Sequence, residues 1–266
     1  MNNLTQVFKK RKAFISFVVA GDPNFNATVA HVVALANAGS DIVELGIPFS
    51  DPVADGPEIQ AADLRAFKDH TTTERVFEMV TAIREQTQVP LVFLTYINIV
   101  FKYGYEAFTK RCAELGVSGL VIPDLPLEEQ DELRPFADRF GINLISLIAP
   151  TSPVERIQKI AKKATGFIYV VSSMGVTGVR NDIQTDLKAL IENIRQVTDV
   201  PTAIGFGIHT PQQAATMAEL ADGVIVGSAI VHQIAAGNTR QHTDLALTEY
   251  VKQVRTAIDK VSIAQN

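Results

Sequence analysis

Two acidic residues in the first quarter of the chain have the types and positions that acid/base chemistry requires. Glu44 lies near the carboxyl end of the apolar segment 41–46, and Asp55 follows in the proline-rich stretch 47–60. A carboxylate at the end of a buried strand is partly shielded from water, which raises its pKa toward the range useful for proton transfer. A second carboxylate brought back over it would divide acid/base and electrostatic roles. The pattern predicts a proton-transfer site, although Glu44 could instead form a structural ion pair and Asp55, before a glycine, could be a turn former.

Two glycine-rich segments near the carboxyl terminus indicate a phosphate site. The segment 205–207 reads Gly-Phe-Gly, and Gly227-Ser228 follows the next apolar segment. Barrel enzymes frequently hold phosphate with the loops after strands seven and eight and with the free N–H groups of a short helix. The third glycine of a dinucleotide fingerprint is missing, and the glycines alone would also fit ordinary turns at strand ends. The loop 175–178, also glycine-containing, is predicted on the same face.

Residue types needed for other chemistries are missing or unsuitably placed. Cys112 has no partner base nearby and is interpreted as a packing residue. No lysine stands at the end of a predicted strand, which disfavours a Schiff-base aldolase mechanism. The histidines show no metal-binding spacing and are interpreted as solvated or capping residues: His31, His70, His209, His232 and His242.

Eight short apolar segments rich in valine and isoleucine must position these residues. They alternate with amphipathic stretches, as expected for buried parallel strands joined by helical crossovers. The interval after the second segment is the longest, and long ordered loops are commonly functional. The predicted strands cover residues 13–20, 41–46, 90–95, 119–123, 143–148, 167–171, 201–204 and 223–226.

The amino terminus adds one element to this alternating pattern. Leu4, Val7 and Phe8 fall on one face of a predicted short helix that leads into the first strand. Eight uninterrupted units predict an α/β fold, a (β/α)₈ TIM barrel with an extra N-terminal helix and a long loop after strand two. We expect a single domain over residues 1–266, with a Rossmann-like open sheet as the alternative.

Composition narrows the functional classes. The chain is 47% hydrophobic and 20% charged, values typical of a globular protein with a sizeable core rather than a disordered or fibrous one. The net charge of -5 is spread along the chain without a basic stripe, so nucleic-acid binding is not expected. The apolar run after the basic residues 9–12 is too short for a signal peptide or a membrane span. With one cysteine, the composition predicts a cytoplasmic protein.

The stretch 44–57 resembles the signature of the tryptophan synthase alpha subunit family. It reads Glu-Leu-Gly-Ile-Pro-Phe-Ser-Asp-Pro-Val-Ala-Asp-Gly-Pro. The resemblance covers essentially the whole chain in order, and the variation falls at flanks such as 172–174. Further motifs that carry it are Gly21-Asp-Pro23, Tyr96-Ile-Asn98, Pro123-Asp-Leu-Pro126, Ala149-Pro-Thr151, Gly175-Val-Thr-Gly178, Gly205-Phe-Gly207 and Gly227-Ser-Ala229.

This resemblance implies a lyase of tryptophan biosynthesis that splits indole-3-glycerol phosphate into indole and glyceraldehyde 3-phosphate. Glu44 would be the general acid/base, and Asp55 would accept a hydrogen bond from the indole N–H. No metal and no organic cofactor is implied for this subunit, since the pyridoxal phosphate of the complex belongs to the beta partner. The implied substrate-binding residues are Phe17, Leu94, Tyr96, Tyr169, Thr177, Gly178, Phe206, Gly207, Gly227 and Ser228.

A beta subunit, in an α₂β₂ complex, is the implied partner. We expect it to dock on the carboxyl face of the barrel, at residues 47–60, 97–103 and 124–129, and to accelerate an otherwise slow lyase. Indole-glycerol-phosphate synthases and ribulose-phosphate epimerases would share the phosphate end. They place a lysine or metal-binding residues at strand ends, and none is found here. A non-enzymatic activator and a free-standing lyase remain as further alternatives.

Overall fold

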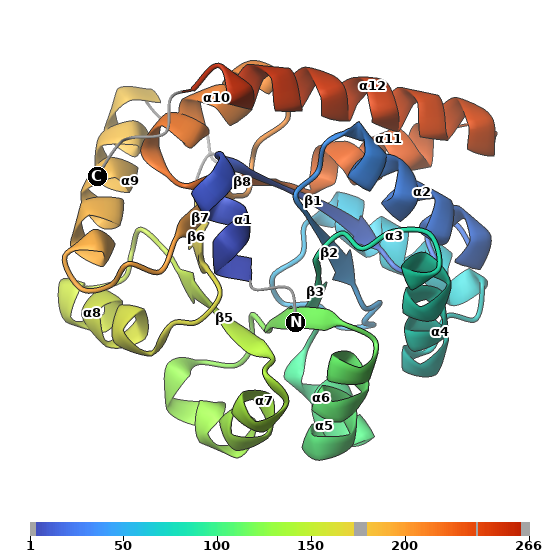
Figure 1. Ribbon diagram of the computed structural model, residues 1–266, viewed down its shortest axis with the longest axis horizontal. Helices are drawn as coiled ribbons and strands as arrows, with labels where there is room; N and C mark the ends of the chain where they lie inside the picture. Colours follow the sequence, from blue (N-terminus) through green and yellow to red (C-terminus); the bar gives the residue numbers. More distant parts are fainter. Residues whose placement is uncertain (1–3, 173–179, 238, 262–266) are drawn as a thin grey trace.

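Eight parallel strands close into a barrel in chain order in the computed structural model, which describes residues 4–172, 180–237 and 239–261 (Figure 1). Closure is direct, because β1 pairs with β8 as well as with β2. The prediction of a barrel is confirmed, and an open sheet is excluded. The strands are β1 (Ala13–Val19), β2 (Ile42–Gly46), β3 (Leu91–Leu94), β4 (Val117–Val121), β5 (Asn143–Ile148), β6 (Ile168–Val171), β7 (Thr202–Gly205) and β8 (Gly223–Val226).

Helices surround this barrel and cover the outward faces of its strands (Figure 1). Their apolar residues and the outward strand residues form one large buried cluster, as expected when parallel strands are buried on both faces. The helices are α1 (Leu4–Lys10), α2 (Phe25–Ala38), α3 (Pro57–Lys68), α4 (Thr73–Arg84), α5 (Ile97–Tyr103), α6 (Tyr105–Glu114), the 3₁₀ turn η1 (Leu127–Glu132), α7 (Arg134–Phe140), α8 (Val154–Lys163), α9 (Arg180–Arg195), α10 (Pro211–Leu220), α11 (Ser228–Ala236) and α12 (Arg240–Asp259).

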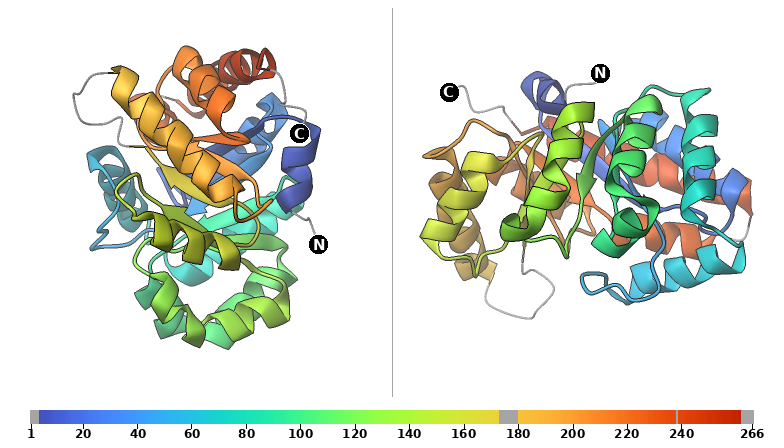
Figure 2. Two further views of the ribbon diagram at one scale, coloured as in Figure 1. Left: turned by 90° about the vertical axis from the view of Figure 1, so that its left-hand side faces the viewer. Right: turned by 90° about the horizontal axis from the view of Figure 1, so that it is seen from below.

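The predicted extra helix, α1, closes the amino end of the barrel. Leu4 and Phe8 are buried with barrel-interior residues such as Ile15, and the rings of Phe8 and Phe167 lie 5.6 Å apart. The right-hand view of Figure 2 places α1 at one end of the barrel and α3 at the other. Among the described residues, the amino end of the barrel is therefore filled by apolar side chains.

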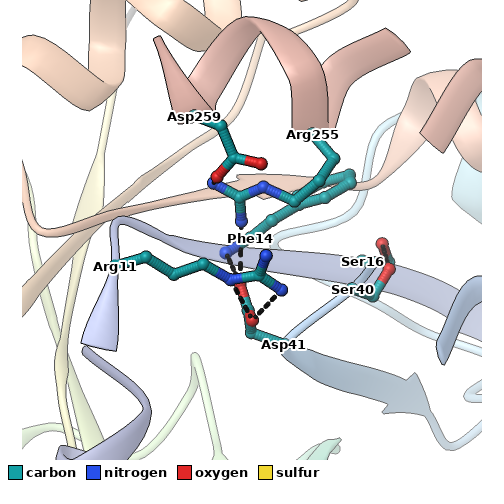
Figure 3. Close-up of polar contacts among 7 residues, drawn as sticks. All are labelled: Arg11, Phe14, Ser16, Ser40, Asp41, Arg255 and Asp259. Atoms are coloured by element: carbon teal, nitrogen blue, oxygen red, sulfur yellow. Dashed lines mark hydrogen bonds and ion pairs between the residues drawn. The ribbon is translucent and has the colours of Figure 1, made fainter. Parts of the chain in front are cut away.

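A partly buried ion-pair cluster also ties elements together at the amino end (Figure 3). The carboxylate of Asp41 accepts hydrogen bonds from Arg11 at 2.7 Å, from Arg255 at 2.8 Å and from the backbone N–H of Phe14 at 2.9 Å. The Nη2 atom of Arg255 forms an ion pair with the carboxylate of Asp259 at 2.7 Å. The cluster joins α12 to the starts of β1 and β2, which are far apart in sequence.

The long loop predicted after strand two is also present, but over residues 47–56 rather than 47–60, because α3 already begins at Pro57, a residue suited to the first turn of a helix. Its start is held by the neighbouring strand ends, since Ala20 N–H donates to Gly46 O and Ile47 N–H donates to Leu94 O. The loop therefore leaves the barrel at its carboxyl end, beside β1 and β3.

Two interpretations of single residues have different outcomes. Cys112 is buried in the main core, so its interpretation as a packing residue is confirmed. His31, interpreted as solvated or capping, is 2% exposed, and its Nε2 lies 3.7 Å from the Asp244 carboxylate of α12. That interpretation is wrong because the burial of His31 depends on α12 packing over α2, which local sequence cannot reveal.

In the part of the chain that the structure describes, no helix is long and apolar enough to span a membrane.

Candidate active site

A cavity of about 330 Å³ opens at the carboxyl end of the barrel. Its volume suits a small organic ligand. Tyr96 is not part of its wall and lies behind Asp55, while Thr177 and Gly178 fall outside the described residues. The predicted residues that line the cavity are Phe17, Glu44, Asp55, Leu94, Tyr169, Phe206, Gly207, Gly227 and Ser228.

Strand alternation directs Glu44 into the barrel. Val43 and Leu45 belong to the outer core under the helices, whereas Ile42 belongs to the barrel interior. Side chains two apart on a strand share a face, so Glu44 lies on the same inner face as Ile42, one step nearer the carboxyl end. Phe17 of β1 is its partner in the parallel register.

The carboxyl group of Glu44 is removed from water. The residue is 2% exposed, and Oε1 has no hydrogen-bond partner within the part of the chain that the structure describes. Burial, with a smaller contribution from the nearby charge of Asp55, raises the pKa of Glu44 to about 8. A group with this pKa can donate and accept a proton near neutral pH. These surroundings favour proton transfer over a structural ion pair.

Asp55 is held by side chains rather than by its own turn. The hydroxyl of Tyr96 donates to Asp55 Oδ2 at 2.7 Å, and the same hydroxyl accepts the Ala54 N–H at 3.2 Å. The amide of Gln60 donates to the Asp55 backbone carbonyl at 2.7 Å. Burial raises the pKa of Asp55, and the Tyr96 hydrogen bond opposes this rise by favouring the carboxylate. The carboxylate is therefore a fixed acceptor at the cavity wall.

Two strand-end glycines make room for the aromatic residues of the cavity. A Cβ atom at Gly46 would lie 2.8 Å from the ring of Phe17, and one at Gly205 would lie 2.3 Å from the Tyr169 hydroxyl. Any larger residue at either position would displace the ring. Gly205 was grouped with a phosphate segment in the sequence, and the structure gives it this steric role instead.

The loops after β7 and β8 meet at one end of the cavity. Phe206 and Gly207 both have positive φ, 75° and 70°, a strained conformation for Phe206. Ser172 fixes this turn by donating its hydroxyl to the carbonyls of Gly205 and Phe206. On the neighbouring loop α11 starts at Ser228, and its first N–H groups have no acceptor within the helix. Together these loops form a surface of backbone donors suited to an anion.

Several lining residues were not predicted from the sequence. Period-2 alternation along β8 could have found Ile225, which lies in the barrel interior. His209 contributes to the cavity lining from the loop after β7. Its backbone N–H donates to the side-chain oxygen of Gln213 at 2.9 Å. The others carry no chemical signature and are placed by the path of the loops: Val53, Ala54, Gly56, Ile59 and Ile208.

Comparison with known proteins decides the family. The model of the family "Tryptophan synthase alpha chain" matches residues 4–259. A tryptophan synthase alpha chain of Lactiplantibacillus plantarum is 63% identical over 259 residues, which cover 97% of each chain. The chain belongs to the tryptophan synthase alpha chain family. A Lacticaseibacillus casei alpha chain is similarly close, at 62% identity over 97% of this chain and 96% of that one.

Solved structures agree with this assignment. The alpha subunit of Legionella pneumophila strain Paris superposes with a TM-score of 0.89 at 34% identity, over 98% of this chain and all of the other. A chain of Mycobacterium tuberculosis tryptophan synthase, in an aminoacrylate-bound form, gives 0.86 at 31% identity, over 97% of this chain and all of the other. As an alpha chain of tryptophan synthase, this protein is a carbon–carbon lyase of tryptophan biosynthesis that cleaves indole-3-glycerol phosphate and has a beta subunit as its partner.

Proposed function

We propose that the cavity at the carboxyl end of the barrel is the lyase site, with Glu44 as general acid/base and Asp55 as the electrostatic partner. The observation that carries this proposal is the carboxyl group of Glu44, which is buried, has a raised pKa and faces the same cavity as Asp55. A pair of carboxyl groups with different surroundings can divide proton transfer and charge stabilisation between them.

The reaction follows from the protonation states of the pair. Glu44, protonated near neutral pH, donates its proton to C3 of the indole ring, which places positive charge on the ring. The Asp55 carboxylate accepts a hydrogen bond from the ring N–H and stabilises that charge as it develops. The Glu44 carboxylate then takes the proton of the glycerol 3′-hydroxyl. The C–C bond breaks, its electron pair neutralises the ring, and indole and glyceraldehyde 3-phosphate are the products.

The other residues that line the cavity indicate where the indole ring and the phosphate of the substrate would bind. Phe17 and Leu94 supply the apolar wall on which an indole ring would stack, and Tyr169 lines the same cavity with its ring 6.0 Å from the ring of Phe206. The backbone of 206–207 and 227–228 would hold the phosphate, because free N–H groups at a helix start attract anions. Thr177 and Gly178 stay predicted contacts of Asp55 and phosphate.

The proposal also covers the cofactors, the assembly, the domain organisation and the location of the protein. The reaction needs proton transfer and charge stabilisation, both of which side chains supply, so we assign no metal and no organic cofactor to this subunit. Pyridoxal phosphate is assigned to the beta partner, in an α₂β₂ complex. We also propose that residues 1–266 form one domain and act in the cytoplasm, as expected from one cysteine and the composition.

The test is a direct assay of indole release from indole-3-glycerol phosphate by the purified chain, with and without a beta subunit. We expect slow release alone and faster release as the beta subunit is titrated, because a partner that binds the competent loop arrangement shifts its population. A rate that stays flat at saturating partner would contradict the activation. A complete lack of indole release in both conditions would favour the non-enzymatic activator.

A further inference from the structure

The described residues that line the cavity include no lysine or arginine to neutralise a phosphate group. One imidazole, that of the exposed His209, lies among them. Binding of a phosphate must therefore depend mainly on backbone N–H groups, as in the concave N–H clusters that other proteins use for anions. How firmly the backbone holds those groups then matters for affinity, because a donor that is already oriented needs no ordering when the ligand binds.

The loop after β7 keeps N–H groups available while its carbonyl groups are bound elsewhere. Phe206 and Gly207 line the cavity, and in the part of the chain that the structure describes their N–H groups have no backbone acceptor. The carbonyl of Gly205 accepts the Ser172 N–H at 2.9 Å. The Ser172 hydroxyl is shared between the carbonyls of Gly205 and Phe206, at 3.0 and 2.6 Å. The donors of this turn are thus left for a ligand.

The far end of the same loop is fixed independently of Ser172. The side-chain oxygen of Gln213 accepts the backbone N–H groups of His209 and Thr210 at 2.9 and 3.1 Å. The hydroxyl of Tyr250, on α12, donates to the His209 carbonyl at 3.0 Å. Among these contacts, only the near end of the loop depends on the serine.

The near end of the loop needs support because its conformation is unfavourable. Phe206 has a φ of 75°, in the left-handed region that residues other than glycine rarely adopt, and Gly207 follows at 70°. The ring of Phe206 meets the ring of Tyr169 edge-on, with centroids 6.0 Å apart, but 42% of the Phe206 side chain is exposed. Packing alone therefore gives this residue little support, and hydrogen bonds must hold the turn.

Ser172 is well placed to provide those hydrogen bonds. It directly follows β6, whose last residue, Val171, lies opposite Gly205 in the parallel register with β7. Its side chain is 3% exposed, so water competes little for its hydroxyl. Ser172 is not one of the described residues that line the cavity. Any effect that it has on a ligand must therefore act through the turn it holds.

We propose that Ser172 is a positioning residue for phosphate, because its hydroxyl holds the strained turn 205–207 so that the N–H groups of Phe206 and Gly207 stay available to the anion. The inference rests on the proposed function, since it assumes that the loop after β7 receives the phosphate of indole-3-glycerol phosphate. Without the hydroxyl, Phe206 relaxes toward negative φ and the N–H groups lose their fixed orientation. The effect falls on phosphate binding and not on proton transfer by Glu44.

Ser172→Ala in the full-length chain tests this role by comparing two ligands. We expect the calorimetric affinity for glycerol phosphate to fall about tenfold, or about 1.4 kcal/mol, while the affinity for indole, which carries no phosphate, changes by less than about twofold. KM for indole-3-glycerol phosphate should rise by a similar factor with little change in kcat, as when an interaction common to substrate and transition state is lost. Unchanged glycerol phosphate affinity, or an equal loss for both ligands, would overturn the proposal.

Ser146→Ala is the matched control. Ser146 of β5 is 4% exposed, and its hydroxyl has no hydrogen-bond partner within the described residues. Its removal should leave both affinities unchanged. Should Ser172→Ala not fold, as judged by circular dichroism, Ser172→Cys takes its place, because a thiol is a weaker donor of similar size and the same selective loss is expected.

A double-mutant cycle with Phe206→Gly shows whether the Ser172 hydroxyl acts through the strained turn. Glycine adopts positive φ readily, so the turn needs less support in that background. We expect Ser172→Ala to weaken glycerol phosphate binding by less than about threefold there, against about tenfold in the wild-type background. Equal factors in the two backgrounds would overturn the proposal, since a merely structural role of Ser172 would not couple to position 206.

Failure of this inference is distinguishable from failure of the phosphate assignment. Gly227→Asp alters the loop after β8 instead and is titrated with glycerol phosphate in parallel. If Gly227→Asp weakens binding and Ser172→Ala does not, the phosphate site stands and Ser172 has no positioning role. If neither variant weakens binding, the phosphate binds elsewhere and the inference falls together with the site.

Discussion

Asp41 directly precedes strand β2 at the amino end of the barrel, and Glu44 lies inside the strand, three residues further toward the carboxyl end; their carboxyl groups meet opposite surroundings. At the amino end, Asp41 accepts hydrogen bonds from two arginines and from a backbone N–H (Figure 3). Toward the carboxyl end, Glu44 is buried with one oxygen that has no partner within the described residues. The same residue class is thus paired with cations at one end of the strand and kept from them at the other.

This difference separates stability from chemistry along the barrel. A paired carboxylate joins distant elements and stays ionised, which suits a structural role. An unpaired buried one destabilises the folded state but gains a pKa that suits proton transfer. Barrels commonly divide their two ends in this way, with catalysis at the carboxyl ends of the strands.

The largest expected effect is the loss of lyase activity in Glu44→Gln. The amide has nearly the shape of the acid but cannot exchange a proton, so we expect indole release to fall by about 10²- to 10⁴-fold. The measurement is initial-rate indole release, with circular dichroism to verify folding. Near wild-type turnover in the folded variant would remove Glu44 from the mechanism. Asp41 and Glu44 would then no longer differ in whether they take part in the reaction.

The next largest effect is a loss of stability when Asp41, at the amino end of the barrel, is replaced. Asp41→Ala leaves Arg255, which is 7% exposed, without one of its two carboxylates, and we expect a loss of about 3 kcal/mol in the free energy of unfolding. Urea unfolding measures it. Glu106→Ala, which breaks an exposed pair with Arg139, is the control and should change stability by less than about 1 kcal/mol. A drop in kcat of the folded Asp41→Ala protein would contradict the separation of roles.

A smaller, pH-dependent effect should appear in the stability of Glu44→Gln. The pKa of Glu44 is raised from 4.5 to about 8 in the folded state, so the folded form keeps a proton that the unfolded chain releases. Wild-type stability therefore falls as pH rises from about 4.5 to about 8 and then levels off. The variant lacks this loss, and we expect it to gain about 2 kcal/mol relative to wild type between pH 5.5 and pH 7, because one proton released by the unfolded chain costs about 1.4 kcal/mol per pH unit in this range. A stability difference that is independent of pH would show that Glu44 is not desolvated.

The smallest effect concerns the anion end of the cavity. Gly227→Asp places a negative charge beside the start of α11, and we expect the affinity for glycerol phosphate to fall about tenfold, or about 1.4 kcal/mol. Gly227→Ala is the matched control, because a Cβ there would lie 3.4 Å from the Phe17 ring and needs little adjustment. Calorimetric titration compares the two. Equal affinities would move the phosphate to another part of the carboxyl face.

Patterns within single segments made much of this molecule predictable. A charged residue near the end of an apolar strand identified Glu44, and the repeat of apolar segments and amphipathic stretches predicted the barrel, the helix α1 and the loop after β2. These features depend on side-chain alternation and helical periodicity, which are local and are therefore legible in the chain itself.

Only the tertiary structure decided which groups lose water and which neighbours they meet. His31 is buried because α12 packs on α2, and Asp63 is buried because α3 folds back over β1. Gly205 gives room to Tyr169 of another strand, and Tyr96 reaches Asp55 from a loop 41 residues away in sequence. Desolvation and contact depend on segments that are distant along the chain, so residue types and spacing could name the candidates for chemistry but could not assign their surroundings.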